Sequence, residues 1–313
     1  MLFITNRMPV GSVITEYGRN FEFNINNNDA GASVFFCDYD AASGVSTELG
    51  YSHFFMTLFN SAPKNLVFFI HGFNNFPADV LSLVYQMNEQ YGNASPEGIQ
   101  FIPVIWPASG GYGLINKYFN DYDASMRSDL AFARAIALFF NYKTNNLKGE
   151  SFGKNMYVMA HSMGNLTLCS LLHRWRFDNS QYIDTTLFKT AFLIAADIED
   201  NALEAQQDGE VICQLSTDVI VYHARDDYVL GASIAINMGR TGYGSHRLGS
   251  HGPRNPKLIY SNVHVIDCSA VNNLINSELG HSYYFIPDRG DRMTAVMSHI
   301  ITAIRDGEIR ATL

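Results

Sequence analysis

The chain has 313 residues, of which 47% are hydrophobic and 16% are charged. Disorder of the whole chain is excluded, because 22 Phe and 17 Tyr supply ample material for a buried core. The 21 Lys and Arg against 30 Asp and Glu give a net charge of −9, which argues against binding the phosphate backbone of a nucleic acid.

The sequence also bears on location. Residues 1–7 lack a basic segment followed by a long apolar one, so we expect no signal peptide. No run of about 18 apolar residues occurs, so we expect no transmembrane segment. The cysteines lie far apart and form no C-x-x-C pair, which argues against a disulfide framework or a zinc site and favours a reducing, cytoplasmic compartment. They are Cys37, Cys169, Cys213 and Cys268.

The first sixty residues are expected to form antiparallel strands. Apolar residues alternate at Phe21, Phe23 and Ile25, and again at Val34 and Phe36, after a stretch rich in Asn and Gly at 24–32. Such alternation is typical of strands with one buried face. Residues 1–60 therefore predict an N-terminal antiparallel hairpin.

From Leu66 onward, short continuous apolar runs alternate with helical patterns. Runs of this kind indicate strands that are covered on both faces, as in a parallel sheet. They lie at 66–70, 101–106, 156–160, 191–196, 219–222 and 263–266. Helical stripes lie between or after them at 80–87, 132–140 and 293–304, the last with Gly307 as a stop. The pattern predicts an α/β fold with a doubly wound, mostly parallel sheet, in a single domain over residues 1–313.

One segment between the last two predicted strands has an unusual composition. Residues 240–257 contain Arg240, Arg247, Arg254 and Lys257 and no acidic residue. We expect a solvated, turn-rich loop over the edge of the sheet, with an anion-binding loop as the alternative. The wider segment 231–258 is interpreted as a lid or an edge loop.

The sharpest local signal is the sequence Ala-His-Ser-Met-Gly at 160–164. It follows a predicted strand and precedes a helical pattern, and a serine at such a turn is forced into a strained conformation that exposes its hydroxyl. This geometry needs small residues two positions before and after the serine, which Ala160 and Gly164 provide. Ser162 is therefore the candidate nucleophile. The amide of Met163, at a helix N-terminus, is a candidate oxyanion donor.

A second signal, His-Gly-Phe-Asn-Asn at 71–75, ends another apolar run. Gly72 allows the backbone to approach the neighbouring strand, and the amide of Phe73 is the second candidate oxyanion donor. The alternative is an ordinary turn at the end of a strand, in which His71 bonds to nearby backbone.

With these two motifs the sequence resembles members of the α/β-hydrolase superfamily. It resembles in particular a group of bacterial serine hydrolases with an HGFN turn and an AHSMGN elbow. The resemblance extends through Val-Ile-Trp-Pro at 104–107, Ala-Asp-Ile at 196–198, the strand end near 222–230, Arg-Leu-Gly at 247–249 and His-Ser-Tyr-Tyr at 281–284. The elbow departs from the wider superfamily by opening with Ala160 instead of glycine.

The resemblance implies a triad in the chain order nucleophile, acid, histidine. Asp227 is the preferred acid, since in similar sequences the acid falls three residues before a leucine, here Leu230. Asp226 and Asp197 remain alternative acids. His281 is the candidate base, because it lies C-terminal to every candidate acid.

These residues predict a serine hydrolase that cleaves a carboxylic ester or related acyl bond of a small-molecule substrate through an acyl-enzyme. No cofactor and no metal are expected, because no motif for either is complete. The alternatives are an acyltransferase or an amide or thioester hydrolase on the same scaffold, and a non-catalytic binding module. The sequence does not indicate an oligomeric state.

Overall fold

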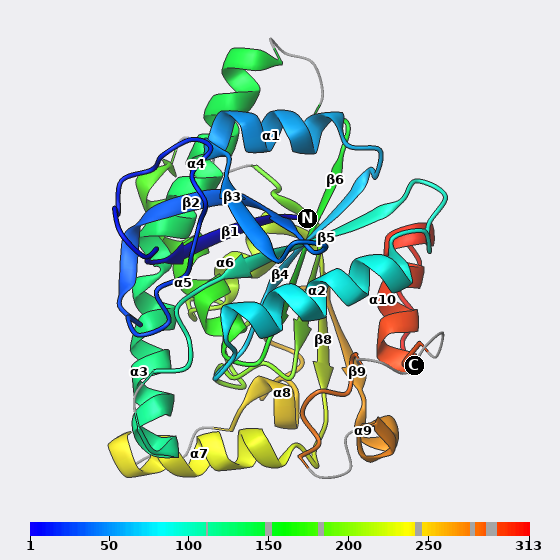
Figure 1. The fold of residues 1–313 in the computed structure, drawn as a ribbon. Coiled ribbons are helices and arrows are strands. Elements are labelled where there is room, and N and C mark those ends of the chain that lie inside the picture. Colours follow the sequence, from blue (N-terminus) through cyan, green and yellow to red (C-terminus); the bar gives the residue numbers. More distant parts are fainter. Residues whose placement is uncertain (111, 148–151, 181–184, 242–245, 276–278, 286–292) are drawn as a thin grey trace.

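The computed structural model describes residues 1–110, 112–147, 152–180, 185–241, 246–275, 279–285 and 293–313. Within these residues, nine strands form one sheet in the order β3-β2-β1-β5-β4-β6-β7-β8-β9 (Figure 1). The strands are β1 (Leu2–Arg7), β2 (Ala30–Asp40), β3 (Val45–Glu48), β4 (Asn65–Ile70), β5 (Ile99–Ile105), β6 (Asn155–His161), β7 (Phe188–Ile194), β8 (Ser216–His223) and β9 (Val263–Asp267). Only the pairs β1–β2 and β2–β3 are antiparallel, so the mostly parallel sheet with an antiparallel N-terminal part is confirmed.

The described helices lie between or after the strands. They are α1 (Gly50–Asn60), α2 (Pro77–Tyr91), α3 (Leu114–Arg127), α4 (Asp129–Asn146), α5 (Gly164–Asp178), α6 (Glu210–Leu215), α7 (Tyr228–Thr241), α8 (Leu248–His251), α9 (Ser269–Ile275) and α10 (Ala295–Asp306). The final helix ends as expected at Gly307, which adopts a left-handed conformation with φ of 68°.

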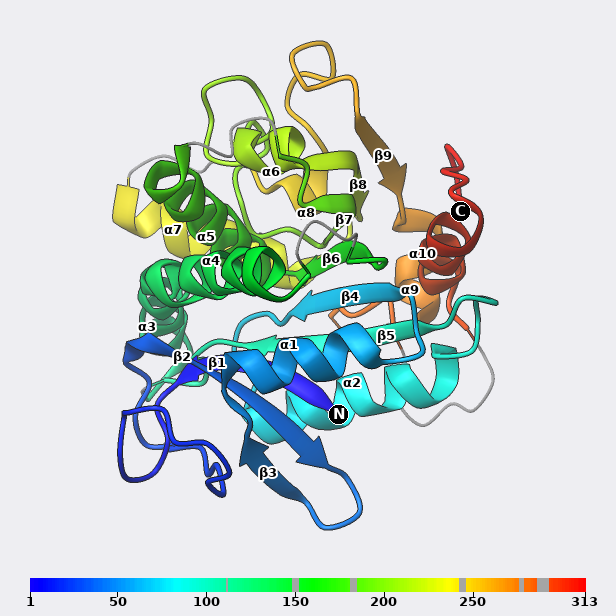
Figure 2. The ribbon, with the colours of Figure 1, turned by 90° about the horizontal axis from the view of Figure 1, so that it is seen from above.

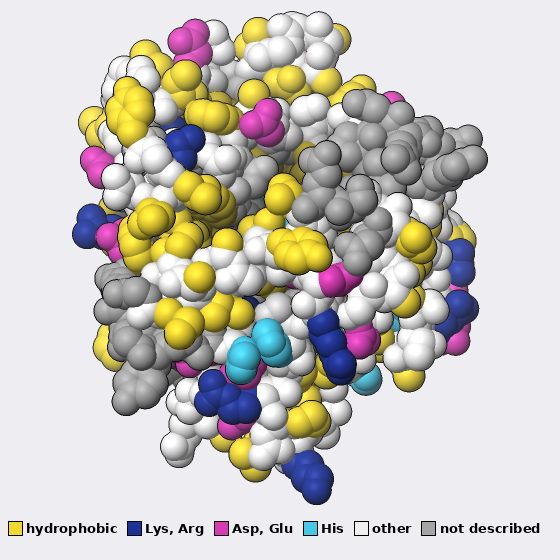
Figure 3. Space-filling model, turned by 90° about the horizontal axis from the view of Figure 1, so that it is seen from below, with side chains coloured by type: hydrophobic (Ala, Val, Ile, Leu, Met, Phe, Trp, Pro, Cys, Tyr) yellow, Lys and Arg dark blue, Asp and Glu magenta, His cyan; other side chains and the backbone are white. Residues whose placement is uncertain are grey.

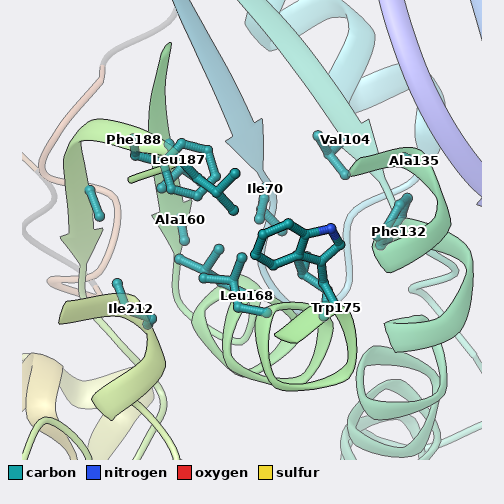
Figure 4. Close-up of a cluster of buried hydrophobic side chains, with 14 of the residues drawn as sticks. Ile70, Val104, Phe132, Ala135, Ala160, Leu168, Trp175, Leu187, Phe188 and Ile212 are labelled. Atoms are coloured by element: carbon teal, nitrogen blue, oxygen red, sulfur yellow. The ribbon is translucent and has the colours of Figure 1, made fainter. Parts of the chain in front are cut away.

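Two buried apolar clusters fill the spaces on the two faces of the sheet. One packs α1, α4, α5 and α6 against it, and the other packs α2 and α10 (Figure 2). In the first cluster the indole of Trp175 on α5 points toward the sheet near Ile70, with Phe132 of α4 alongside (Figure 4). Because both faces are covered, the central strands contain uninterrupted apolar stretches, which is why the sequence showed continuous runs.

The N-terminal strands differ in position from the prediction. Residues 21–25 form one isolated bridge, of Phe23 with Pro9, so a strand there is wrong. The long strand β2 holds Val34 and Phe36 as expected, and its antiparallel partners are β3 and β1. β1 was not predicted, although all six of its residues are buried. It joins the antiparallel part to the rest of the sheet, because it also pairs in parallel with β5.

The segment 231–258 is more ordered than a loop. It contains most of α7 and all of α8, while residues 242–245 lie outside the described part. The expectation of a solvated connection is wrong for Arg247, because its side chain is buried and pairs with Asp197. Arg254 also pairs, with Asp200. The side chain of Arg240 lies outside the described residues.

The strand order changes direction at one point inside the sheet. From β4 the chain goes to β5 on one side, and it then returns across β4 to β6 and continues to β9 on the other side. The strand order therefore reverses between β4 and β6, and the crevice at the carboxyl ends of such a strand pair is where ligands bind in open α/β sheets. The loops after β4 and β6 carry the two sequence signals, and α7 lies beyond the same ends of the strands (Figure 1).

Candidate active site

Ser162 occupies a tight turn between β6 and α5. Its φ is +55°, a left-handed conformation that is uncommon for a residue with a side chain. The side-chain amide of Asn165 stabilises this turn. Its Nδ2 donates to the carbonyl oxygens of Ala160 at 3.1 Å and Ser162 at 3.0 Å. The strained serine predicted from the strand–turn–helix pattern is thus present, and Asn165 is a supporting residue that the pattern alone did not reveal.

Two glycines allow the loops after β4 and β6 to meet. A Cβ placed on Gly164 would lie 2.5 Å from the carbonyl oxygen of Ile70. A Cβ on Gly72 would lie 2.8 Å from the Cβ of Ser162. Real Cβ atoms do not approach backbone or side-chain atoms so closely, so both positions require glycine for the observed contact. The approach expected at Gly72 is therefore real, and its partner is the candidate nucleophile itself.

The two candidate oxyanion donors border this contact. Met163 is the N-cap of α5, a helix of 15 residues, so its amide points out of the helix start. Phe73 directly follows Gly72. Among the described residues, neither amide donates a hydrogen bond to a protein acceptor. Both are therefore available to an oxygen atom bound beside Ser162.

His281 and Asp227 form the closest pair of ionisable side chains at the site. Nδ1 of His281 lies 2.8 Å from Oδ2 of Asp227, and the carboxylate is fully buried. The other oxygen of Asp227 accepts the amide of Leu230 at 2.9 Å, which fixes the carboxylate at the start of α7. With Nδ1 donating to Asp227, Nε2 is the ring nitrogen available for proton transfer. His281 and Ser162 line the same cavity, and no hydrogen bond joins these two described side chains.

The two alternative acids have other partners. Asp226 accepts the side-chain amide of Asn272 at 2.9 Å. Asp197 lies near Ser162, where its amide donates to the Ser162 carbonyl at 3.2 Å, but its carboxylate binds Tyr118, Ser233 and Arg247. Of the three candidate acids, Asp227 is the one that contacts His281.

His161 packs against the candidate base. Its Nε2 lies 3.2 Å from the carbonyl oxygen of His281, and the two rings are 4.8 Å apart between centroids. Burial, reinforced by the nearby His281, lowers the pKa of His161 well below its ordinary value. His161 is thus neutral near pH 7, and Nε2–H can donate to the loop that carries His281.

His71 is a structural residue at the end of β4. Its ring stacks on Trp106 at 4.9 Å, and its Nδ1 lies 2.9 Å from the Gly72 carbonyl. If Nδ1–H donates there, Nε2 accepts the Trp106 amide at 3.2 Å, so both nitrogens are satisfied in the neutral ring. Burial lowers the pKa of His71 to about 4. His71 therefore holds the turn instead of transferring protons.

Sequence reasoning also missed the residues that brace the loop after Gly72 and the neighbouring loop after β5. The buried carboxylate of Asp121 on α3 accepts the amides of Asn74, Ser109 and Gly110 at 2.9–3.0 Å. Arg7, fully buried at the end of β1, donates to the Ala108 carbonyl at 2.7 Å. A single arginine at the end of the N-terminal segment Leu-Phe-Ile-Thr-Asn was the sequence signal for this second contact.

A cavity of about 780 Å³ lies over Ser162 and His281. This volume suits a small-molecule ligand. Helix α2 contributes mostly polar lining residues and α7 mostly apolar ones. They are Asp79, Ser82, Leu83 and Gln86 of α2, and Tyr228, Val229, Ala232, Ser233 and Ile236 of α7. Leu114, Tyr228 and Leu279 line the cavity and are more than half exposed at its rim. Hydrophobic side chains gather on the face beyond the carboxyl ends of the strands (Figure 3). The cavity therefore offers an apolar side next to a more polar one.

Neither a metal site nor a membrane-spanning helix is found among the described residues. There, no group of three or more His, Cys, Asp or Glu side chains is arranged to hold a metal ion. Within the same residues, no helix combines the length and apolar character needed to cross a bilayer. The four cysteines are free thiols, and all are buried.

Residues 34–289 match the family described as "Alpha/beta hydrolase of unknown function (DUF900)". The chain belongs to this α/β-hydrolase family. The match includes the elbow, both oxyanion candidates, Asp227 and His281, and it begins after β1. The membership agrees with the sheet order and with the position of the elbow at the β4–β6 reversal.

Among solved structures, the chain is similar to two structures of one bacterial protein. "Ferulic Acid bound to Est1E from Butyrivibrio proteoclasticus" is 12% identical, with a TM-score of 0.31, and the match covers 79% of this chain and 89% of that one. "Est1E from Butyrivibrio proteoclasticus" is 12% identical with a TM-score of 0.29, over 66% and 79% of the two chains. No curated protein matches.

Proposed function

We propose that this protein is a serine hydrolase that cleaves a carboxylic ester or a related acyl bond through an acyl-enzyme. The observation that carries the proposal is the buried 2.8 Å contact of His281 with Asp227, in the same cavity as the strained Ser162. A serine hydroxyl is a poor nucleophile until a base takes its proton, and the base needs a third group to orient it. The three side chains supply these roles in the family's chain order.

In the proposed first step, Oγ of Ser162 attacks the carbonyl carbon of the substrate while Nε2 of His281 takes the hydroxyl proton. Asp227 stabilises the imidazolium that forms, because its carboxylate holds Nδ1–H. The negative charge that develops on the carbonyl oxygen is met by the amides of Phe73 and Met163. The bond to the leaving alcohol then breaks, and the alcohol departs with the proton from Nε2.

The second step releases the acyl group. A water molecule gives a proton to Nε2 of His281 and attacks the acyl carbon, and the bond to Ser162 breaks as Oγ recovers the proton. The products are a carboxylic acid and the free enzyme. The mostly apolar side of the cavity along α7 suits an acyl chain, so ester substrates are the first class to test.

Labelling with a fluorophosphonate tests this proposal directly. We expect a covalent adduct on Ser162 in the wild-type protein and none in Ser162→Ala. Ser125→Ala is a matched control, because Ser125 is a buried serine on α3 that donates to the Tyr122 carbonyl, and it should label normally. Absence of an adduct on Ser162 in the folded wild-type protein would favour a non-catalytic binding module.

A product assay separates the remaining alternatives. Short ester, amide and thioester substrates are offered with and without an added alcohol as acceptor. Release of free acid from esters supports the ester hydrolase. Transfer of the acyl group to the alcohol in preference to water would instead indicate an acyltransferase with the same acyl-enzyme.

A further inference from the structure

A second polar cluster lies beside the proposed triad. It consists of Asp197, Tyr118, Ser233, Asn237 and Arg247, and we call it the Asp197 cluster. Ser233 Oγ donates to Oδ1 of Asp197 at 2.6 Å, and Tyr118 Oη donates to Oδ2 at 3.0 Å. Nδ2 of Asn237 donates to Tyr118 Oη at 2.9 Å. Arg247 Nε lies 3.1 Å from Oδ1 and supplies the opposite charge that a buried carboxylate requires.

The cluster forms the wall between two cavities. Asp197, Tyr118 and Ser233 line the cavity over Ser162. Asp197, Asn237 and Arg247 line a separate cleft of about 690 Å³ between α3, α5 and the loop after β7. Asp197, Tyr118 and Ser233 are each at most 5% exposed, so their polar atoms depend on one another instead of on bulk water.

The cluster connects three parts of the proposed site. The amide of Asp197 donates to the carbonyl of Ser162 at 3.2 Å, which ties it to the elbow. The Tyr118 ring packs on Phe73, the proposed oxyanion donor, with 5.8 Å between ring centroids. Ser233 and Asn237 belong to α7, the apolar wall of the cavity. One carboxylate thus joins the elbow, the oxyanion loop and the α7 wall.

We propose that Asp197 and Tyr118 are positioning residues, which hold the α7 wall and the oxyanion loop in register with Ser162. This inference rests on the proposed serine-hydrolase function. Charge-assisted hydrogen bonds of a buried carboxylate are short and directional, so they fix their partners more firmly than apolar contacts would. The tyrosine has two separable parts, because its hydroxyl reaches the α7 wall through the cluster while its ring supports Phe73.

Three variants separate these parts. Ser233→Ala and Tyr118→Phe each remove one hydroxyl that binds Asp197, while Tyr118→Phe keeps the ring on Phe73. We expect both to raise KM for a long-chain ester about three- to tenfold with kcat nearly unchanged, since the α7 wall that contacts the acyl chain is held less firmly. Tyr118→Ala also removes the ring, and we expect kcat to fall by about tenfold or more because the oxyanion donor is displaced.

Hydrogen exchange gives a readout that needs no catalysis. In Ser233→Ala and Tyr118→Phe, the α7 amides should exchange about tenfold faster than in the wild type, because their local opening becomes easier. The control is again Ser125→Ala, a buried serine on α3 that does not contact Asp197. Its α7 exchange, KM and kcat should match the wild type. Asp197→Asn is less informative, because it leaves Arg247 buried without its charge partner and the protein can fail to fold.

The outcomes are distinct. If the wild type neither labels at Ser162 nor hydrolyses any ester, the proposed function fails, and faster α7 exchange in the two hydroxyl variants would still establish the anchoring role of the cluster. If the wild type is active and both hydroxyl variants match Ser125→Ala in exchange and in KM, the positioning role is overturned. A drop in kcat for Tyr118→Phe as large as for Tyr118→Ala would overturn the separate role of the ring.

Discussion

Replacing Gly72 by alanine tests the contact on which the proposed site is built. The loop after β4 approaches the elbow so closely that a Cβ on residue 72 would lie 2.8 Å from the Cβ of Ser162. The same atom would lie 3.2 Å from both Nδ1 and the carbonyl oxygen of His161. The new methyl group is thus confined by the candidate nucleophile on one side and by its neighbour on the other.

The size of the effect follows from these distances. Two carbon atoms pack best at about 3.5–4.0 Å, so the methyl group must push the elbow and the loop apart by roughly 0.7–1.2 Å. A displacement of about 1 Å between reacting groups can lower a rate about 100-fold. Phe73 follows Gly72 directly, so the proposed oxyanion donor moves together with the loop. We therefore expect kcat for an ester substrate to fall about 100-fold.

The assay is ester hydrolysis and fluorophosphonate labelling of Gly72→Ala, with thermal unfolding to establish that the variant is folded. Gly231→Ala is the matched control, because a Cβ there meets no atom within 4 Å and the residue lies on helix α7. It should keep the wild-type rate and gain up to about 1 kcal/mol of stability from helix propensity. A folded Gly72→Ala that reacts as fast as Gly231→Ala would refute the close approach of the two loops.

Three further predictions concern other parts of the molecule. Asp227→Asn should lower kcat by about 10⁴-fold, because His281 loses the partner that fixes its tautomer, whereas Asp226→Asn should have little effect in the same ester assay. Acidification from pH 7 to 5 should reduce the free energy of unfolding by about 2 kcal/mol through His71, whose pKa is about 4 when folded and 6.5 when free, so that the unfolded chain binds more protons in this range. Urea titrations at both pH values check this, and His71→Gln should show a smaller loss. Gly307→Ala should cost about 1 kcal/mol in a thermal melt, since φ at this helix end is 68°.

The parts of the fold that could be predicted from sequence are those whose signal is local. The runs at 66–70 and 156–160 became β4 and β6, because strands covered on both faces need apolar side chains at every position. The elbow was predictable for a similar reason. A strained turn between a strand and a helix restricts its neighbours to small residues, which five consecutive positions can reveal.

The parts that could not be predicted depend on partners distant in sequence. β1 reads as a short apolar start, and only its pairing with both β2 and β5 makes it a central strand. Arg247 lies in a segment with the composition of a solvated loop, yet it is buried because Asp197, 50 positions earlier in the chain, supplies its charge partner. Composition describes the average environment of a segment, and it does not indicate which of several arginines finds a carboxylate.

The two buried aspartates illustrate how the site divides its work. Asp197 and Asp227 follow neighbouring parallel strands, β7 and β8, so the fold brings both carboxylates to the same edge of the sheet. Chain order alone therefore allows either to serve as the acid. Their partners distinguish them, because Asp197 is already bonded to Ser233, Tyr118 and Arg247, while one oxygen of Asp227 remains for His281. A carboxylate committed to holding the α7 wall is not available to orient an imidazole, so the proposed positioning role of Asp197 and the proposed triad role of Asp227 support each other.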